Sequence, residues 1–155
     1  MDIRKILQSE EGFRSQPYLC SNGYVTIGYG TKLHKRKGMN PKNFPLHISE
    51  AAATELLNQE VLSIRNSLLN SKHGKTFADL SRVRQDILVS MAYQLGVTGL
   101  LKFKKTWKNI ELGLFTLAAM EMSDSKWARQ DSPARANRHS LAMAHDNLNE
   151  YKIYF

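Results

Sequence analysis

Apolar residues recur at helical spacing near the start of this 155-residue chain. Ile3, Ile6 and Leu7 form an i, i+3, i+4 stripe, which predicts a short amphipathic helix over residues 2–11. Gly12 is placed to end that helix, because glycine readily adopts the left-handed conformation found just beyond helix C-termini.

Two longer helices are predicted in the middle of the chain. The first follows Ser49, a typical N-cap, and runs to about residue 70 on a stripe of Ala53, Leu57, Val61, Ile64 and Leu68. The second ends at Gly96 and carries Leu80, Val83, Ile87, Met91 and Gln94. Shorter helices are expected at 106–112 and 114–122, and a last one begins at Ser132-Pro133. Segments 35–48 and 71–75 are predicted to be loops.

Residues 17–34 show the alternation and turn residues of β-structure. Pro17 opens the segment and Asn22-Gly23 is a hairpin signal, with a third short strand expected through Lys32 and His34. The sequence allows two pairing registers for the hairpin around Asn22-Gly23. A two-residue loop pairs position 20 with 25, whereas a three-residue loop with Gly23 in the bulge position pairs 20 with 24 and places Cys20 on the face of Thr26.

This order of elements predicts an α+β fold: a helix, a small sheet, a long helix, then helices only. We expect one domain over residues 1–155, with a small N-terminal lobe at about 12–50. A connecting helix is expected at about 50–70 and a helical C-terminal lobe at about 71–155, toward which the 2–11 helix packs. A cleft between the lobes is the natural place for a ligand.

Composition narrows the classes of function. The net charge of +8 favours anionic partners such as nucleic acid, acidic lipid or cell-wall polymer. The single cysteine excludes an intrachain disulfide. The N-terminal residues do not resemble a signal peptide, and no apolar run is long enough to predict a membrane span.

Three residues in the N-terminal part are candidates for chemistry. Glu11 is predicted at the C-terminal end of a helix, where negative charge is disfavoured, and a carboxyl kept protonated is what a general acid requires. Thr26 offers a hydroxyl that can hold a water, and Cys20 offers a thiol. The alternatives are a solvated Glu10–Glu11 pair, a threonine selected for β-propensity and a small buried cysteine. The five histidines show no metal-ligand spacing, so no metal or organic cofactor is expected.

The spacing of these residues resembles a known family. Glu11, position 20 and Thr26 in the setting GYVTIGYG look like the catalytic region of the T-even phage lysozymes, family 24 of the glycoside hydrolases. The stretch SRVRQDILVSMAYQLGVTGLLKF at 81–103 looks like the family's central helix and the turn after it. SKWARQDSPARANR at 125–138 looks like its tryptophan-containing segment and final arginine-rich helix.

The resemblance implies a muramidase that hydrolyses the β-1,4 bond between N-acetylmuramic acid and N-acetylglucosamine in peptidoglycan. By position, Glu11 is the general acid, residue 20 assists the water or stabilises the cationic sugar, and Thr26 orients the water. The residues that correspond to substrate-contacting positions are Gly30, Tyr93, Gln94, Phe103, Thr106 and Arg135, of which Arg135 corresponds to an arginine that approaches the catalytic glutamate. Trp127 corresponds to a core tryptophan.

Position 20 departs from the best-known members, which carry aspartate there. A thiol with an ordinary pKa of about 8.5 is mostly neutral at pH 7, so ionic help to a water requires a thiolate and nearby positive charge or donors. One hypothesis makes Cys20 a partial thiolate that acts as base or nucleophile. The other gives it a space-filling role only.

Other classes of function remain open from the sequence. A lytic transglycosylase needs only one glutamate, because a hydroxyl of the sugar replaces water, although Thr26 favours hydrolysis. A basic, non-catalytic peptidoglycan-binding module is a second alternative, and nucleic-acid binding is a weaker one because no reader motif is present.

The resemblance also implies a biological setting. A phage endolysin is made in the host cytoplasm, depends on a holin for passage through the membrane, and acts in the periplasm on the cell wall. We expect a monomer whose partner is bacterial peptidoglycan. Use in a virion tail is the alternative setting.

Overall fold

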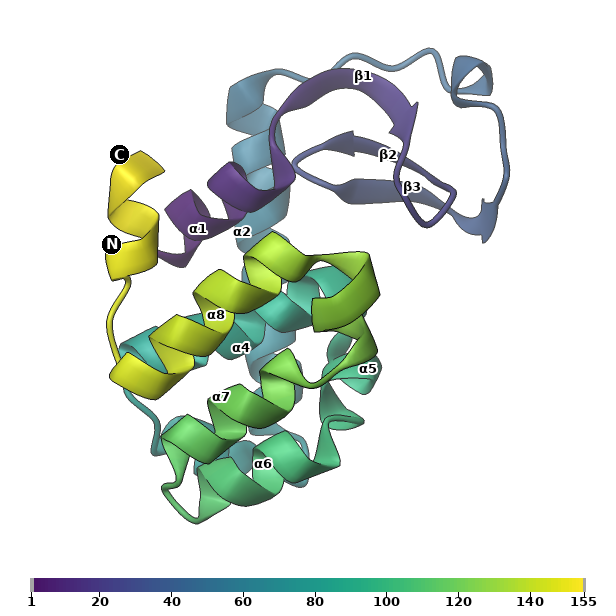
Figure 1. Ribbon diagram of the computed structural model, residues 1–155. Coiled ribbons are helices and arrows are strands. Elements are labelled where there is room, and N and C mark those ends of the chain that lie inside the picture. The colour runs from purple at the N-terminus through teal and green to yellow at the C-terminus, as the bar shows by residue number, and fades with distance from the viewer. Residues whose placement is uncertain (1, 155) are drawn as a thin grey trace. The chain divides into compact units, whose positions relative to one another are not determined.

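The computed structural model describes residues 2–154 (Figure 1). It confirms the predicted α+β class: a small sheet lies near the N-terminus and the remainder is mostly helical. The elements in chain order are α1 (Ile3–Glu11), β1 (Arg14–Leu19), β2 (Tyr24–Gly28), β3 (Thr31–Lys37), a 3₁₀ turn (Pro41–Asn43), α2 (Glu50–Leu69), α3 (Gly74–Ala78), α4 (Arg82–Leu95), α5 (Val97–Leu101), α6 (Lys104–Glu111), α7 (Phe115–Ser123), a π-helical turn (Trp127–Asp131), α8 (Pro133–His145) and a 3₁₀ turn (Asn149–Tyr154).

The chain divides into two compact units, and each is described by itself. The N-terminal unit comprises Arg4–Leu62, and the helical unit comprises residues 2–3 and 63–154 of the described chain. The boundary falls inside α2, which was expected to be a connecting helix. The expectation of one domain over the whole chain stays a prediction. Within the described residues, no helix has the length and apolarity that crossing a bilayer requires.

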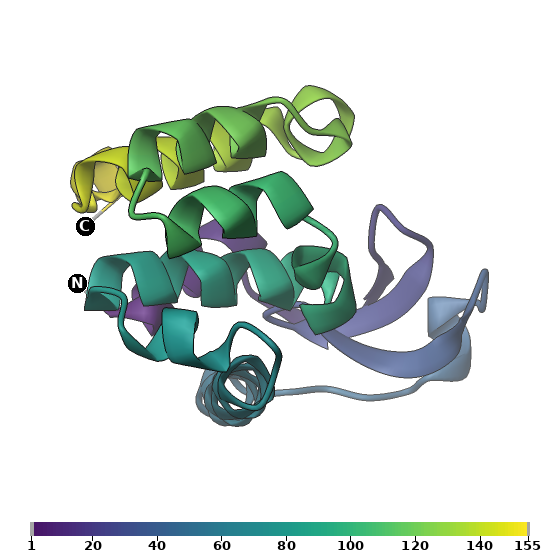
Figure 2. The same ribbon diagram turned by 90° about the horizontal axis from the view of Figure 1, so that it is seen from below.

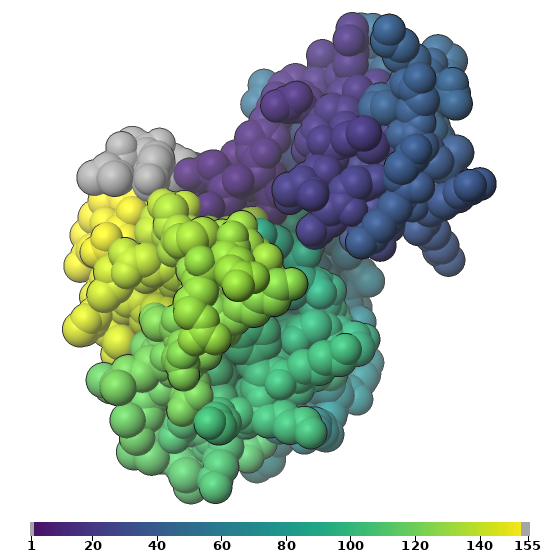
Figure 3. All heavy atoms as spheres, turned by 45° about the vertical axis from the view of Figure 1, so that its right-hand side comes forward, coloured from purple at the N-terminus to yellow at the C-terminus, as the bar shows by residue number. Residues whose placement is uncertain are grey.

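The N-terminal unit is built on an antiparallel sheet with the strand order β1-β2-β3. The central strand β2 is almost wholly buried, whereas most residues of β3 are exposed and belong to the surface drawn in dark purple and blue in Figure 3. Gly28 packs so closely on α2 that an added Cβ would lie 3.0 Å from the Cβ of Ala53. The Tyr29 hydroxyl donates a hydrogen bond of 2.7 Å to Glu50, which ties the end of β2 to the first residue of α2.

The helical unit packs around α4, which is buried along most of its length. Helix α7 packs against α6 and α8, and α8 packs against α4 (Figure 2). The large apolar side chains with almost no exposed surface include Phe77, Ile87, Met91, Leu100, Trp107 and Met122. One buried charge is compensated here: Asp86, 1% exposed, forms ion pairs with both Arg65 and Arg82.

Capping residues marked the start of α2 and the end of α4 correctly, although Leu80, which was expected in the second helix, lies before the start of α4 at Arg82. Ser49 accepts a hydrogen bond from the Ala52 amide at the start of α2, and Gly96 ends α4 at a φ of +77°. Three further details of the prediction were wrong. Helix α3 begins at Gly74, inside the segment 71–75 that was expected to be a loop, α5 was missed, and β3 continues to Lys37, inside the segment expected to be irregular. Short elements of this kind lack a full period of apolar residues, so the pattern carries little signal for them.

The first strand also begins earlier than predicted, at Arg14 instead of Pro17. Proline has no amide hydrogen to donate to a neighbouring strand, so it marked a boundary in the sequence. Because β1 is an outer strand of the sheet, a residue without that donor is tolerated within it.

Candidate functional site

Glu11 is the last residue of α1, as the sequence predicted. Gly12 adopts a φ of +67°, and its amide donates a hydrogen bond of 3.1 Å to the carbonyl of Gln8. This closes the helix and turns the chain directly into β1. The half-buried Glu11 side chain therefore lies at the junction between α1 and β1, the strand that leads to Cys20.

The hairpin between β1 and β2 adopts the three-residue loop. The Cys20 amide donates to the Tyr24 carbonyl at 3.0 Å, and the Gly23 amide donates to the Cys20 carbonyl at 2.8 Å. Gly23 has a φ of +82°, the left-handed conformation that the bulge position requires. Tyr18 pairs with Thr26, so Tyr18, Cys20, Tyr24 and Thr26 share one face of the sheet. Of the two registers that the sequence allowed, the structure selects the one that unites Cys20 with Thr26.

Cys20 is half-buried at the start of the hairpin loop. Partial burial raises the pKa of its thiol, but hydrogen bonds from the backbone of Tyr24 and Asn22 and from the Thr26 hydroxyl act in the opposite direction, as does the positive charge of Lys32. Together these groups bring the pKa of Cys20 below its ordinary value. A thiolate requires donors and a nearby positive charge; the hairpin provides the donors and Lys32 on β3 provides the charge.

Thr26 is almost fully buried, with 2% of its surface exposed. Its hydroxyl donates a hydrogen bond of 2.9 Å to the Tyr24 carbonyl. A hydroxyl has a single proton to donate, so the Tyr24 carbonyl and the Cys20 sulfur compete for it. The oxygen lone pairs remain able to accept a hydrogen bond from a water on the Cys20 side, which is the arrangement that orienting a water requires.

Tyr18 connects Glu11 and Cys20 electrostatically. Burial raises the pKa of the Tyr18 phenol, and the negative charges of Glu11 and Cys20 raise it further, against the opposing effect of Arg14. The Arg14 guanidinium lies 4.6 Å from the centroid of the Tyr18 ring. The sequence indicated Tyr18 only as an apolar neighbour of Glu11, although its position two residues before Cys20 was a signal for a shared face.

Gly30, a predicted substrate-contacting residue, lies in the tight turn between β2 and β3. Its φ is +82°, so glycine is required there for the backbone conformation. This turn sets the pairing of Thr26 with Lys32 on the next strand.

Tyr93 and Gln94 lie in the last turn of α4 and are half-buried. The Gln94 amide is held at both ends: its oxygen accepts from the Trp127 indole at 2.8 Å, and its nitrogen donates to the Ser132 hydroxyl at 2.6 Å. Trp127 is 2% exposed, which agrees with the structural role expected for it. Gln94 is therefore fixed by the π-helical turn and the start of α8.

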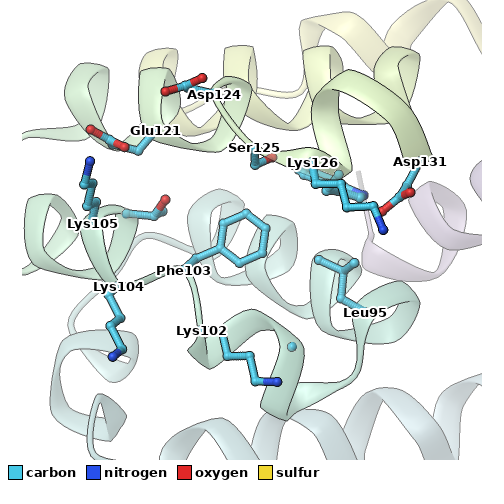
Figure 4. Close-up of a pocket in the computed structure, with 13 residues that line it drawn as sticks. Leu95, Lys102, Phe103, Lys104, Lys105, Glu121, Asp124, Ser125, Lys126 and Asp131 are labelled. Atoms are coloured by element: carbon cyan, nitrogen blue, oxygen red, sulfur yellow. The ribbon is translucent and has the colours of Figure 1, made fainter.

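Phe103 and Thr106 line a pocket of about 480 Å³ within the helical unit (Figure 4). The Phe103 ring projects toward the middle of the pocket, and it lies edge-on to Trp127 at 6.3 Å between ring centroids. The remaining lining is mainly charged, with Lys102, Lys104, Lys105, Lys126, Glu121, Asp124 and Asp131. An aromatic floor with a polar margin suits an uncharged ring that bears many hydroxyl and amide groups.

Arg135 is buried in the helical unit, with 6% of its surface exposed. Its Nη2 donates hydrogen bonds of 3.0 Å to both the carbonyl and the hydroxyl of Ser90. The same hydroxyl lies 2.8 Å from Nε2 of His139, whose Nδ1 lies 2.6 Å from the Tyr151 hydroxyl. Arg135 thus belongs to a buried polar cluster, which we call the Ser90 cluster: Ser90, Arg135, His139 and Tyr151.

Metal binding gains no support from the arrangement of ligands. Among the described residues, no three His, Cys, Asp or Glu side chains come together in a group that could hold an ion.

Comparison with known proteins establishes the family. Residues 8–140 match the family model described as phage lysozyme. The chain belongs to the phage lysozyme family. Two proteins from Dictyostelium discoideum, probable T4-type lysozymes 1 and 2, are 30% and 29% identical to it, and each alignment covers 97% of this chain and 98% of the relative. The pre-baseplate central spike protein Gp5 of Enterobacteria phage T4 is 28% identical over 99% of this chain, which corresponds to 29% of Gp5.

Family membership makes this protein a lysozyme-like hydrolase of peptidoglycan. The family match begins at residue 8, so it includes the segment that carries Glu11, Cys20 and Thr26. It ends at residue 140, so it also includes the Phe103 pocket and most of α8.

Proposed function

We propose that the protein is a muramidase that hydrolyses the β-1,4 bond between N-acetylmuramic acid and N-acetylglucosamine. The observation that carries the proposal is the hairpin register, which places Cys20 and Thr26 on one face of the sheet. Tyr18, on the same face, is influenced by the charges of both Glu11 and Cys20. An acid, a sulfur base and a water-holding hydroxyl are thus grouped within one small unit.

In this proposal Glu11 donates its proton to the glycosidic oxygen as the bond to the sugar breaks. The resulting sugar has oxocarbenium character, which a nearby negative charge stabilises. Cys20, as a thiolate, supplies that charge and acts as base or nucleophile. Thr26 orients the attacking water through its oxygen, because its only proton is shared between the Tyr24 carbonyl and the Cys20 sulfur.

Residues outside the reacting centre are assigned to saccharide binding. We propose that Gly30, Tyr93, Gln94, Phe103, Thr106 and Arg135 contribute to it. The Phe103 pocket supports this assignment for Phe103 and Thr106, because an aromatic ring offers a surface on which a sugar ring can pack. For Gln94 and Arg135, the hydrogen bonds to Ser132, Trp127 and Ser90 favour an indirect contribution through the shape of the site.

The deciding experiment is mass spectrometry of the fragments released from purified Gram-negative peptidoglycan. Saccharides with a free reducing muramic acid would establish hydrolysis at the proposed bond. Fragments lighter by one water, as 1,6-anhydro sugars, would identify a lytic transglycosylase. No release by the folded protein would favour a basic binding module.

The contribution of Cys20 is tested by two substitutions. If the thiolate takes part, Cys20→Asp should move the pH optimum for peptidoglycan hydrolysis to lower pH, because a carboxylate is ionised at lower pH than a thiol. Identical pH profiles would contradict this. Near-full activity of Cys20→Ala would show that the side chain only fills space.

The proposed setting is phage-induced lysis of a bacterial host. The enzyme would be made in the host cytoplasm, reach the periplasm with the help of a holin, and act there as a monomer on the cell wall. The net charge of +8 supports attraction to anionic wall surfaces. The likeness to the spike protein Gp5 keeps a virion-associated use as the second setting, and detection of the protein in purified virions would favour it.

A further inference from the structure

The third strand brings a cation to the face of the sheet that carries Cys20. Lys32 on β3 pairs with Thr26 on β2, so its side chain belongs to the same face as Thr26 and Cys20. Its ammonium lies 4.1 Å from the centroid of the Tyr24 ring. The carbonyl of Tyr24 accepts a hydrogen bond from the Cys20 amide. Lys32 is thus anchored on the aromatic ring directly beside the cysteine.

The turn through Gly30 sets this placement, and an irregularity farther along the sheet brings a second lysine to the same ring. Tyr24 pairs with Lys37, whereas Thr26, two residues later on β2, pairs with Lys32, five residues earlier on β3. The extra residues of β3 bulge out of the ladder, and both lysines approach the Tyr24 ring, with Lys37 at 5.1 Å from its centroid. Without the bulge, regular pairing would place His34 opposite Tyr24 and Lys37 farther along β3, while Lys32 would stay opposite Thr26.

Other charges face the same region. The carboxylate of Glu11, at the end of α1, raises the pKa of the Tyr18 phenol. The guanidinium of Arg14, on β1, lies over the Tyr18 ring. Glu11 and Arg14 are opposite in sign, and both act on Tyr18, which precedes Cys20 by two residues in the chain. Lys32 is the cation whose charge acts on the Cys20 thiol, together with the amides of Tyr24 and Asn22.

We propose that Lys32 is a positioning residue for the hydrolytic reaction: seated on Tyr24, its ammonium holds Cys20 as a thiolate beside Thr26. A carboxylate at position 20 would carry its own charge at neutral pH, but a thiol needs a neighbouring cation to do so. Lys32 therefore compensates for the presence of cysteine where a carboxylate is usual. The contribution to catalysis rests on the proposed function.

The first test measures the thiol directly. The chain has a single cysteine, so the rate of alkylation by iodoacetamide as a function of pH reports Cys20 alone. Lys32→Met should slow alkylation near pH 7 by about three- to fivefold, because one unit charge a few ångströms from a partly exposed group changes its ionisation by about that factor. Lys32→Arg, which keeps the charge and the contact with the ring, should restore the wild-type rate.

Lys37→Met is the matched control. It removes the same charge from the same strand and the same type of contact with Tyr24, yet Lys37 does not belong to the groups that lower the pKa of Cys20. Its alkylation profile should follow the wild type. Equal profiles for Lys32→Met and wild type, or an equal shift in both lysine variants, would overturn the proposal.

The second test measures turnover of peptidoglycan as a function of pH. Lys32→Met should shift the acidic limb of the kcat profile toward higher pH, whereas Lys37→Met should not. An unshifted limb in Lys32→Met would overturn the catalytic part of the proposal. Since alkylation needs no substrate, a failure of the Lys32–Cys20 interaction is seen in the alkylation profile, and a failure of the proposed muramidase activity is seen in the fragments released by the wild type.

Discussion

Two polar clusters of this protein each place a potential nucleophile beside other polar groups, and they differ in their access to solvent. In the Ser90 cluster of the helical unit, a serine hydroxyl lies 2.8 Å from a histidine whose other nitrogen lies 2.6 Å from a tyrosine. On the sheet of the N-terminal unit, a thiol, the Thr26 hydroxyl and the Lys32 ammonium share one face. By distance alone the first resembles a nucleophile and its base more closely than the second does.

The two clusters differ in how far their side chains are buried. Ser90 and His139 have no exposed surface, and every polar group of the pair has a partner within the cluster. Such a network stabilises and orients its helices but admits no substrate. On the hairpin, Cys20 is partly exposed and competes with a carbonyl for the one proton of Thr26. Cys20 therefore differs from Ser90 in two ways that allow reaction: it is accessible to solvent, and it does not have the Thr26 proton to itself.

The largest expected effect concerns the acid. Glu11→Gln should lower the rate of peptidoglycan hydrolysis by about 10²- to 10⁴-fold, because a neutral amide cannot donate the proton that the leaving oxygen needs. Turbidity loss of a cell-wall suspension measures the rate, and thermal unfolding checks the fold. Glu10→Gln, one residue earlier, is the matched control and should keep most of the activity. Wild-type activity in Glu11→Gln would remove the sheet cluster from catalysis.

The largest expected effect on stability concerns the buried ion pair between Asp86 and Arg65 in the helical unit. Asp86→Ala should cost about 3 kcal/mol in the free energy of unfolding, since it leaves Arg65 without its partner in a largely buried site. Denaturant titration measures the change. Asp79→Ala, which breaks the exposed pair with Lys75, serves as the control and should leave the midpoint unchanged. Equal effects in the two variants would show that burial does not decide how much an ion pair contributes to this protein's stability.

The Ser90 cluster should make the protein sensitive to acid. Burial, followed by the charges of Arg135 and Arg138, holds the pKa of His139 well below its usual value. Below about pH 6.5 the unfolded chain therefore binds a proton that the folded chain does not, and stability should fall by up to about 1.4 kcal/mol per pH unit from this group.

Denaturant titrations between about pH 7 and 5 test this against His139→Gln, which keeps polar atoms but does not titrate in that range. The variant should be less stable at pH 7 and show a shallower dependence on pH. A slope as steep as that of the wild type would assign the acid sensitivity to other groups.

The hairpin register offers the smallest and most specific test. Gly23→Ala places a side chain at a φ of +82° and should cost about 1 kcal/mol in stability. Relief of that strain by a change of turn would also separate Cys20 from Thr26, so the alkylation rate of Cys20 should fall. Gly113→Ala, in the helical unit at a φ of +71° with nothing within 4 Å of the added Cβ, is the control for strain without a change of register. An unchanged alkylation rate in Gly23→Ala would show that the turn does not set the thiol's environment.

The sequence alone determined the elements whose signals are local. The stripe of Ile3, Ile6 and Leu7 predicted α1, and Ser49 and Gly96 marked the ends of two helices, because side-chain periodicity and capping act within a few residues. The spacing of Glu11, Cys20 and Thr26 with the motif around them indicated the phage lysozyme family, which the family match confirms. The individual roles of these residues stay predictions.

Only the tertiary structure decided which groups meet. The choice between two hairpin registers depended on the left-handed conformation of Gly23, and the position of Lys32 opposite Thr26 depended on the pairing of β2 with β3. The burial of Ser90 and His139 likewise arises from the packing of α4 against α8, elements far apart in the chain. Strand pairing and helix packing are set by contacts summed over many distant residues, so their outcome is absent from any short stretch of sequence.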